Sequence, residues 1–112
     1  MAKALLLAWT SPASDETEAE FNSWYDGTHV PQMRAAIPSV SAVHRYRAAE
    51  LPPAAGQRPA HRYLAVYELD SDDVAGAVAA LGSAAGGGRL DMTAAMDTTT
   101  NPPVLQWYQA AG

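Results

Sequence analysis

A histidine follows an aromatic pair in the segment FNSWYDGTHVPQM at residues 21–33, where a helical pattern meets a proline. His29 comes four residues after Tyr25, so the two side chains would share one face of a helix. An ordinary histidine pKa of about 6.5 would let His29 give or take a proton at neutral pH. Tyr25 could orient the imidazole or donate a proton to a developing enolate. These residues predict acid and base chemistry on a small molecule.

Two neighbours of His29, Trp24 and Asp26, are candidates for contact with a substrate. Trp24 could equally belong to the core. Asp26 faces away from His29 on an ideal helix, and its alternative role is to bond the backbone where Pro31 disrupts the helix. His29 also has an alternative role, in which it bonds carbonyl groups that Pro31 leaves unpaired. The sequence leaves these alternatives open.

Further aromatic residues and histidines recur at alternate positions of two predicted strands, 40–50 and 61–69, and such positions share a face. Stripes of tyrosine usually pack in a core, but a pocket for a flat aromatic ligand would use the same residues. Arg45 and Arg47 also share a face and could hold a carboxylate or enolate oxygen; solvated charge or a pair with Glu68 is the plainer alternative. The candidate substrate-binding residues are Trp24, Asp26, His44, Tyr46, His61, Tyr63, Tyr67 and Trp107.

Composition excludes several other chemistries. The absence of cysteine removes disulfides, thiolate nucleophiles, iron–sulfur clusters and cysteine zinc sites. The three histidines lie on different predicted elements without H-x-x-x-H or H-E-x-x-H spacing, so we expect no metal or haem. The chain also has no G-x-S-x-G motif, phosphate-binding loop or dinucleotide fingerprint. We therefore expect no cofactor.

The chain of 112 residues has the length of one domain, and we predict a single domain over 1–112. A net charge of −5 without a run of lysine or arginine argues against a nucleic-acid partner. The apolar run at 4–9 is shorter than a signal-peptide core, and no segment approaches the roughly 18 apolar residues of a membrane span. We expect a cytoplasmic, soluble protein with no membrane partner.

The predicted elements alternate in the order strand, helix, strand, strand, helix, strand. Apolar runs between turn residues predict the strands, and cap residues with apolar spacing predict the helices. This order is that of a ferredoxin-like βαββαβ fold of the α+β class with an antiparallel sheet. The predicted strands are 3–10, 40–50, 61–69 and 104–109; the predicted helices run from Asp15 or Glu16 through a kink at 29–31 to Ala36, from Ser71 to the glycines at 86–88, and over 90–96.

Both faces of the predicted sheet carry hydrophobic side chains. The two helices would cover one face, and the other would alternate to polar residues if it met water. The strands at 3–10, 61–69 and 104–109 do not alternate in this way. We expect two subunits to pack sheet to sheet and leave a cavity lined by tyrosines and tryptophans.

The segment FNSWYDGTHVPQM contains the motif W-Y-D-x-x-H-x-P, and IPSV, HRYRA and RYLAVYEL follow it. With these segments the chain resembles the dimeric α+β barrel superfamily and, within it, the EthD-like group, from residue 4 to about residue 108. The resemblance implies a homodimer that binds a small hydrophobic ligand between sheet and helices. Similar proteins include polyketide cyclases, lactone isomerases, anthrone-type oxygenases, decarboxylases and dehydratases, most of them without a cofactor. The motif points to His29, with Tyr25 and Asp26 beside it.

The resulting expectation is a cofactor-independent enzyme of small-molecule biosynthesis or catabolism that cyclises, isomerises or dehydrates a polyketide-like or aromatic substrate. His29 would act as acid and base, Tyr25 would orient it or donate a second proton, and the pocket wall would include Tyr63, Tyr67 and Trp107. One alternative is oxygenation of an anthrone-like phenol without a metal. Another is a non-catalytic dimer that binds a small ligand or acts in a stress response.

Overall fold

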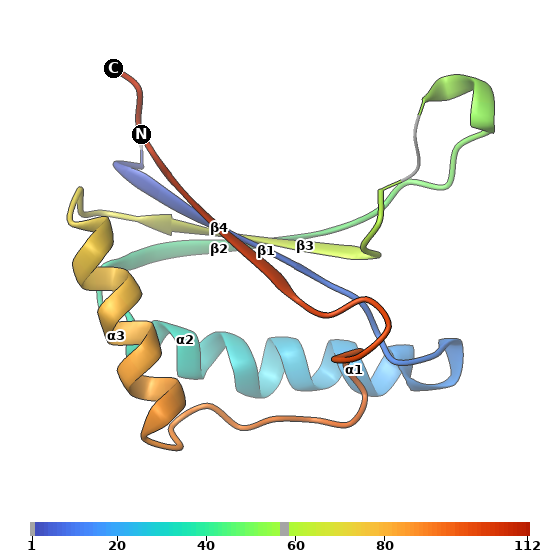
Figure 1. Cartoon of the computed structure of the whole chain (residues 1–112), viewed down its shortest axis with the longest axis horizontal. Coiled ribbons are helices and arrows are strands. Elements are labelled where there is room, and N and C mark those ends of the chain that lie inside the picture. Colours follow the sequence, from blue (N-terminus) through green and yellow to red (C-terminus); the bar gives the residue numbers. More distant parts are fainter. Residues whose placement is uncertain (1, 57–58) are drawn as a thin grey trace.

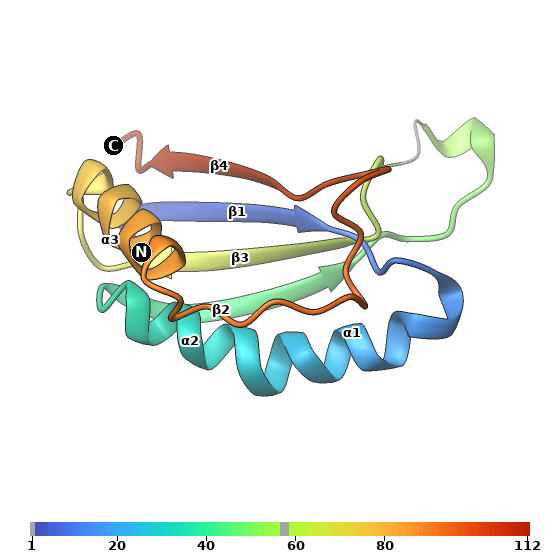
Figure 2. The ribbon, with the colours of Figure 1, turned by 60° about the horizontal axis from the view of Figure 1, so that its bottom comes forward.

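A computed structural model describes residues 2–56 and 59–112, which form one four-stranded sheet with helices on one side (Figure 1). The strands are β1 (Ala4–Thr10), β2 (Val40–Arg47), β3 (Tyr63–Leu69) and β4 (Val104–Gln109). They lie in the order β2-β3-β1-β4, and each neighbouring pair is antiparallel (Figure 2). This confirms the predicted ferredoxin-like α+β fold. Three predicted bounds are wrong, because β1 begins at Ala4, β2 ends at Arg47 and β3 begins at Tyr63.

The strands divide their side chains between a helix-covered face and an open face. Alternate residues of β1 and β3 are buried beneath the helices, and Leu6 lies opposite Tyr67 in the paired register. Register shifts between Val40 and Ala42 mark an irregularity at the start of β2. Beyond it, Arg45 lies opposite Ala65 and therefore shares the helix-covered face. The core lies between this face and the helices.

The first helical segment is a nearly continuous run that lies along one face of the sheet (Figures 1 and 2). Ser14 is its N-cap, and the Ser14 backbone N–H donates to Thr17 Oγ1 at 3.0 Å, one of the bonds of a capping box. Phe21 and Met33 are buried from this run. Its parts are a 3₁₀ turn (Asp15–Thr17), α1 (Glu18–Trp24), a π-helical turn (Tyr25–His29) and α2 (Val30–Ala36).

The π-helical turn replaces the predicted kink at 29–31. Pro31 has no N–H and its ring would collide with the carbonyl group four residues earlier in an ordinary α-helix. The chain widens by one residue just before the proline, and the Val30 N–H donates to the Tyr25 carbonyl five residues back. The helix then continues through Pro31 to Ala36. The irregular turn therefore falls on the residues that could carry chemistry.

The second long helix, α3 (Val74–Gly86), starts and ends with local caps. Its N-cap is Asp73, whose Oδ1 accepts from the Gly76 N–H at 3.0 Å, and not Ser71 as predicted. Ser71 Oγ instead accepts from the Asp73 N–H at 3.1 Å. The helix stops at the predicted glycines, where Gly88 has a φ of 73°, a conformation that favours glycine.

The predicted helix at 90–96 is wrong, because this segment is an irregular connection between α3 and β4. Its backbone bonds a distant segment: the Ala13 N–H donates to the Ala95 carbonyl at 2.7 Å, and Asp97 N–H donates to the Ser11 carbonyl at 2.9 Å. These long-range bonds replace the local bonds of a helix. Within the described ranges 2–56 and 59–112, no helix has both the length and the apolar character needed to span a membrane.

Candidate functional site

The imidazole of His29 packs between two aromatic rings of its own helical run. Trp24 stacks on it, with ring centroids 4.7 Å apart and planes tilted by 22°. Tyr25 meets it edge on, with centroids 4.8 Å apart. A π-helical turn brings residues four and five positions apart toward one face, so both aromatic residues reach His29. The structure thus places Trp24 at the candidate site as well as Tyr25.

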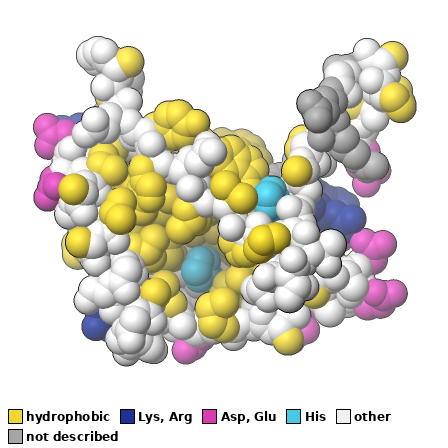
Figure 3. All heavy atoms as spheres, in the orientation of Figure 1, with side chains coloured by type: hydrophobic (Ala, Val, Ile, Leu, Met, Phe, Trp, Pro, Cys, Tyr) yellow, Lys and Arg dark blue, Asp and Glu magenta, His cyan; other side chains and the backbone are white. Residues whose placement is uncertain are grey.

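The surface is hollowed next to this helical run. Figure 3 shows a histidine at the floor of a hollow that is ringed by hydrophobic side chains, between the first helical run, α3 and β4. His29 ends the π-helical turn of this run and is half-buried, and it stacks on Trp24, which is itself partly buried. Partly buried hydrophobic residues pack against the core from the surrounding elements, among them Trp24, Val30, Leu81, Leu90 and Trp107. The hollow is suited to a small apolar ligand.

The two ring nitrogens of His29 have different surroundings. Nδ1 is buried and has no hydrogen-bond partner among the described residues. Nε2 also forms no hydrogen bond with a described residue, but unlike Nδ1 it is not fully buried. It is therefore accessible. The Nε1 atom of Trp24 is also buried without a partner in the described part of the chain. Only Nε2 of the imidazole is therefore free to meet a ligand.

The pKa of His29 is lowered to about 4, chiefly because burial among aromatic rings disfavours the charged form. The positive charge of Arg45 adds to this effect. The expectation of an ordinary pKa is wrong, because the spacing of residues in a helix says nothing of the solvent that tertiary packing removes. His29 is a neutral imidazole at physiological pH.

This lowered pKa predicts that the protein loses stability as pH falls from about 6.5 to about 4. In that window the unfolded chain binds a proton at His29 and the folded chain does not, so the free energy of unfolding falls by up to about 1.4 kcal/mol per pH unit. Urea unfolding between pH 7 and pH 4 measures the slope. In His29→Phe the free energy of unfolding should fall less steeply with pH, because the contribution of His29 is gone. An unchanged dependence on pH would contradict the low pKa of His29.

A pair of buried phenols lies next to the histidine. The hydroxyl groups of Tyr25 and Tyr67 are 2.9 Å apart, across 42 positions of sequence. Burial raises the pKa of both groups, so both remain protonated at neutral pH. The Tyr25 hydroxyl is thus bonded to Tyr67, while the Tyr25 ring packs edge on against the imidazole.

Arg45 connects β2 to the helical run that carries His29. Its guanidinium lies 4.2 Å from the centre of the Tyr25 ring and donates to Asp26 Oδ1 at 3.1 Å and to Asn22 Oδ1 at 3.0 Å. The expectation that Asp26 bonds the backbone is wrong, because the turn at 25–29 points its carboxylate toward β2. Arg45 is only 15% exposed and fixes the π-helical turn against the sheet. Asn22 was not predicted to take part.

Tyr63 belongs to a polar network at the start of α1. Its hydroxyl donates to Glu18 Oε2 at 2.5 Å and accepts from Asn22 Nδ2 at 3.0 Å. The bond from Tyr63, and to a lesser extent the charge of Arg47, lowers the pKa of Glu18. The Tyr63 phenol is therefore held by protein groups, and its role is structural support beside Phe21, 5.4 Å away between ring centres.

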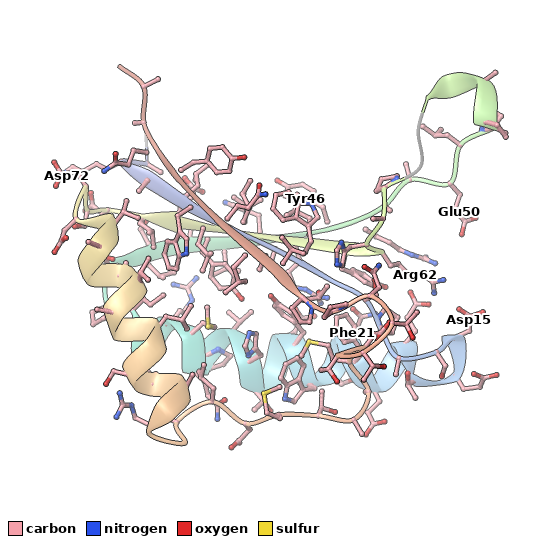
Figure 4. All side chains as sticks on the ribbon, in the orientation of Figure 1. Asp15, Phe21, Tyr46, Glu50, Arg62 and Asp72 are labelled. Carbon is pink, nitrogen blue, oxygen red and sulfur yellow. The ribbon has the colours of Figure 1, made fainter. Side chains whose placement is uncertain are left out.

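Two predicted site residues, His44 and Tyr46, lie on the open face of the sheet, away from His29. Their paired positions on β3 are Val66 and Leu64, whose side chains face away from the helices. Figure 4 shows Tyr46 on one side of the sheet and Phe21 on the other. His44 Nε2 lies 2.6 Å from Glu68 Oε2, so the predicted pairing of Glu68 with the arginines is wrong. The alternation of β2 separates these residues from the hollow.

His61 lies before β3 begins, and its Nε2 is 2.9 Å from the Pro102 carbonyl oxygen. It lines a polar groove of about 400 Å³ at the end of the sheet, near the labelled Asp15 and Arg62 of Figure 4. Arg62 bonds Asp15 and Glu18 there, each at 2.9 Å. The groove was not predicted, and His29 is not among its lining residues.

Trp107 lies opposite Leu6 on the helix-covered face of β4 and is half-buried.

Residues that could bind a metal are scattered. Within the described residues 2–56 and 59–112, no group of three histidine, aspartate or glutamate side chains is placed to hold an ion. The candidate site thus consists of His29 with its aromatic neighbours Trp24 and Tyr25, supported by Tyr67 and Arg45.

Comparison with known proteins places the chain in a family. The EthD domain model matches residues 13–97. An EthD-like protein of Ralstonia eutropha JMP134 is 16% identical, with a TM-score of 0.55 over 100% of this chain and 96% of that one. An ethyl tert-butyl ether D (EthD) family protein of Bacillus halodurans C-125 is 20% identical, with a TM-score of 0.53 over 98% and 99%. A comparison with curated proteins found no match. The chain belongs to the EthD domain family, within the dimeric α+β barrel superfamily.

Proposed function

We propose that the protein is a cofactor-independent enzyme that cyclises, isomerises or dehydrates a small polyketide-like or aromatic substrate beside His29. The observation that carries the proposal is a neutral histidine with one accessible ring nitrogen in a hydrophobic hollow. A substrate that fills such a hollow displaces water from it and is held in one conformer. His29 meets the reacting carbonyl group, and Trp24 and Trp107 contact the rest of the substrate.

These three reactions share one elementary step, the formation of an enol or enolate beside a carbonyl group. Hydrogen–deuterium exchange at the methyl group of 2-acetylnaphthalene in D₂O isolates this step without knowledge of the natural substrate. Mass spectrometry should detect deuterium in the ketone faster with the protein than with buffer alone. Binding without faster exchange would favour the second candidate function, a non-catalytic carrier, which the hydrophobic lining of the hollow also suits.

The open face of the sheet is the proposed interface of a homodimer. Leu5, Leu7 and Trp9 of β1 lie on this face with Leu64 and Val66 of β3, and none of these side chains is fully buried. The chain exposes 6686 Å² of surface, more than the roughly 5900 Å² expected for a monomer of 11.8 kDa. A second copy of the same apolar face would cover it with two-fold symmetry.

Native mass spectrometry tests this assembly, with an expected dimer at twice 11.8 kDa. Leu7→Glu would place a charge at the centre of the interface and should yield monomers. Val78→Glu is the matched control, because Val78 is 44% exposed on α3, away from the open face. A wild-type monomer at micromolar concentration would contradict the proposed dimer.

A further inference from the structure

The donor and acceptor roles of the two His29 nitrogens follow from their different surroundings. A neutral imidazole has one N–H and one lone pair. A proton on Nδ1 would bury a donor with no partner in the described chain, which is unfavourable. Buried N–H groups without partners are rarer in proteins than buried acceptors without partners. The proton is therefore favoured on Nε2, where it can reach solvent or a ligand.

The charges around the imidazole favour a negative ligand. Arg45 is the cation whose charge acts on His29. Its partner Asp26 is 68% exposed, so water screens the negative charge of Asp26 more than the positive charge of Arg45, which is 15% exposed. Tyr25 and Tyr67 are protonated phenols and carry no charge. The charge of Arg45 therefore adds to the cost of an imidazolium, whereas it offsets part of the burial cost of an oxyanion that is hydrogen-bonded to Nε2.

Resting on the proposed function, we infer that His29 acts as a neutral hydrogen-bond donor, through Nε2–H, to the carbonyl or phenol oxygen of a substrate that becomes an oxyanion. The substrate class is then an aromatic ketone or phenol that ionises to an enolate or phenolate in the hollow, and the released proton passes to solvent water. The role of His29 is to stabilise that charge, and it does not have to accept a proton as a general base.

Nitrogen-15 NMR of the full-length protein tests the tautomer without any ligand. At pH 7 the shifts of His29, assigned by their loss in His29→Phe, should show a protonated Nε2 and an unprotonated Nδ1. A proton mainly on Nδ1 would overturn the inference, since Nε2 would then be an acceptor. The result does not depend on whether the protein catalyses exchange, so failure of the proposed function would be distinguishable.

The preference for an oxyanion is tested with 4-nitrophenol, whose phenolate has its own absorbance band. The pKa of bound 4-nitrophenol should lie at least one unit below that of the free compound in the wild-type protein. In His29→Phe, which keeps a flat ring against Trp24, that pKa should rise, because an apolar site without a donor disfavours charge. A raised pKa in both proteins, or no bound 4-nitrophenol at millimolar concentration, would overturn the inferred substrate class.

Discussion

His29→Phe should lower the rate of deuterium exchange into 2-acetylnaphthalene at least tenfold, while the protein stays folded. Phenylalanine keeps a ring that can stack on Trp24, 4.7 Å away in the wild type, but it has no Nε2 to meet the carbonyl oxygen. Removal of one donor to a developing oxyanion in other enzymes costs about 10²–10³ in rate. The expected loss is therefore in kcat, with a smaller change in KM.

The matched control for this variant is His61→Phe. His61 lies just before the start of β3, where its imidazole bonds the Pro102 carbonyl and lines the polar groove. It should keep the wild-type exchange rate. A His29→Phe protein with unchanged exchange would remove His29 from the mechanism, and an equal loss in both variants would show that the effect arises from the fold.

Phe21→Ala should lower the free energy of unfolding by about 3–5 kcal/mol, a large part of the stability of a domain this size. Phe21 is fully buried and lies 5.8 Å from Tyr25 and 6.4 Å from Trp24 between ring centres. Its removal leaves a cavity beneath the rings that hold His29. Urea unfolding, followed by circular dichroism, measures the loss.

The control for the core substitution is Val78→Ala on the exposed face of α3, where Val78 is 44% exposed. It should change the free energy of unfolding by less than about 0.5 kcal/mol. If Phe21→Ala lost under about 1 kcal/mol, the aromatic cluster would not support the site as the packing indicates.

The strands and the shared face of Tyr25 and His29 could be predicted from the sequence, because both depend on local periodicity. Apolar runs between turn residues located all four strands, with errors of one to three residues at the start of β1, the end of β2 and the start of β3. The prediction of a helix at 90–96 was wrong because the structure of this segment depends on distant residues. Its backbone bonds residues near Ser11, and no local sequence pattern reveals these bonds. The segment's apolar residues pack without helical structure.

The details of the site required the tertiary structure. The stacking of Trp24 on His29 depends on the π-helical turn, which ends two residues before Pro31 and shifts the helical register. The bond between Arg45 and Asp26 depends on how β2 lies against the helix. The alternation of β2 had put Arg45 and Arg47 on one face, apart from His44 and Tyr46, but only the tertiary structure shows that the face of Arg45 meets the helices.

A crystal structure of the protein with bound 4-nitrophenol tests most directly the claim that the hollow beside His29 is the functional site. The account predicts that the phenol oxygen lies within hydrogen-bond distance of His29 Nε2 and that the ring contacts the hydrophobic lining. Binding of 4-nitrophenol in the polar groove beside Arg62, or on the open face of the sheet, with no ligand in the hollow, would contradict this account.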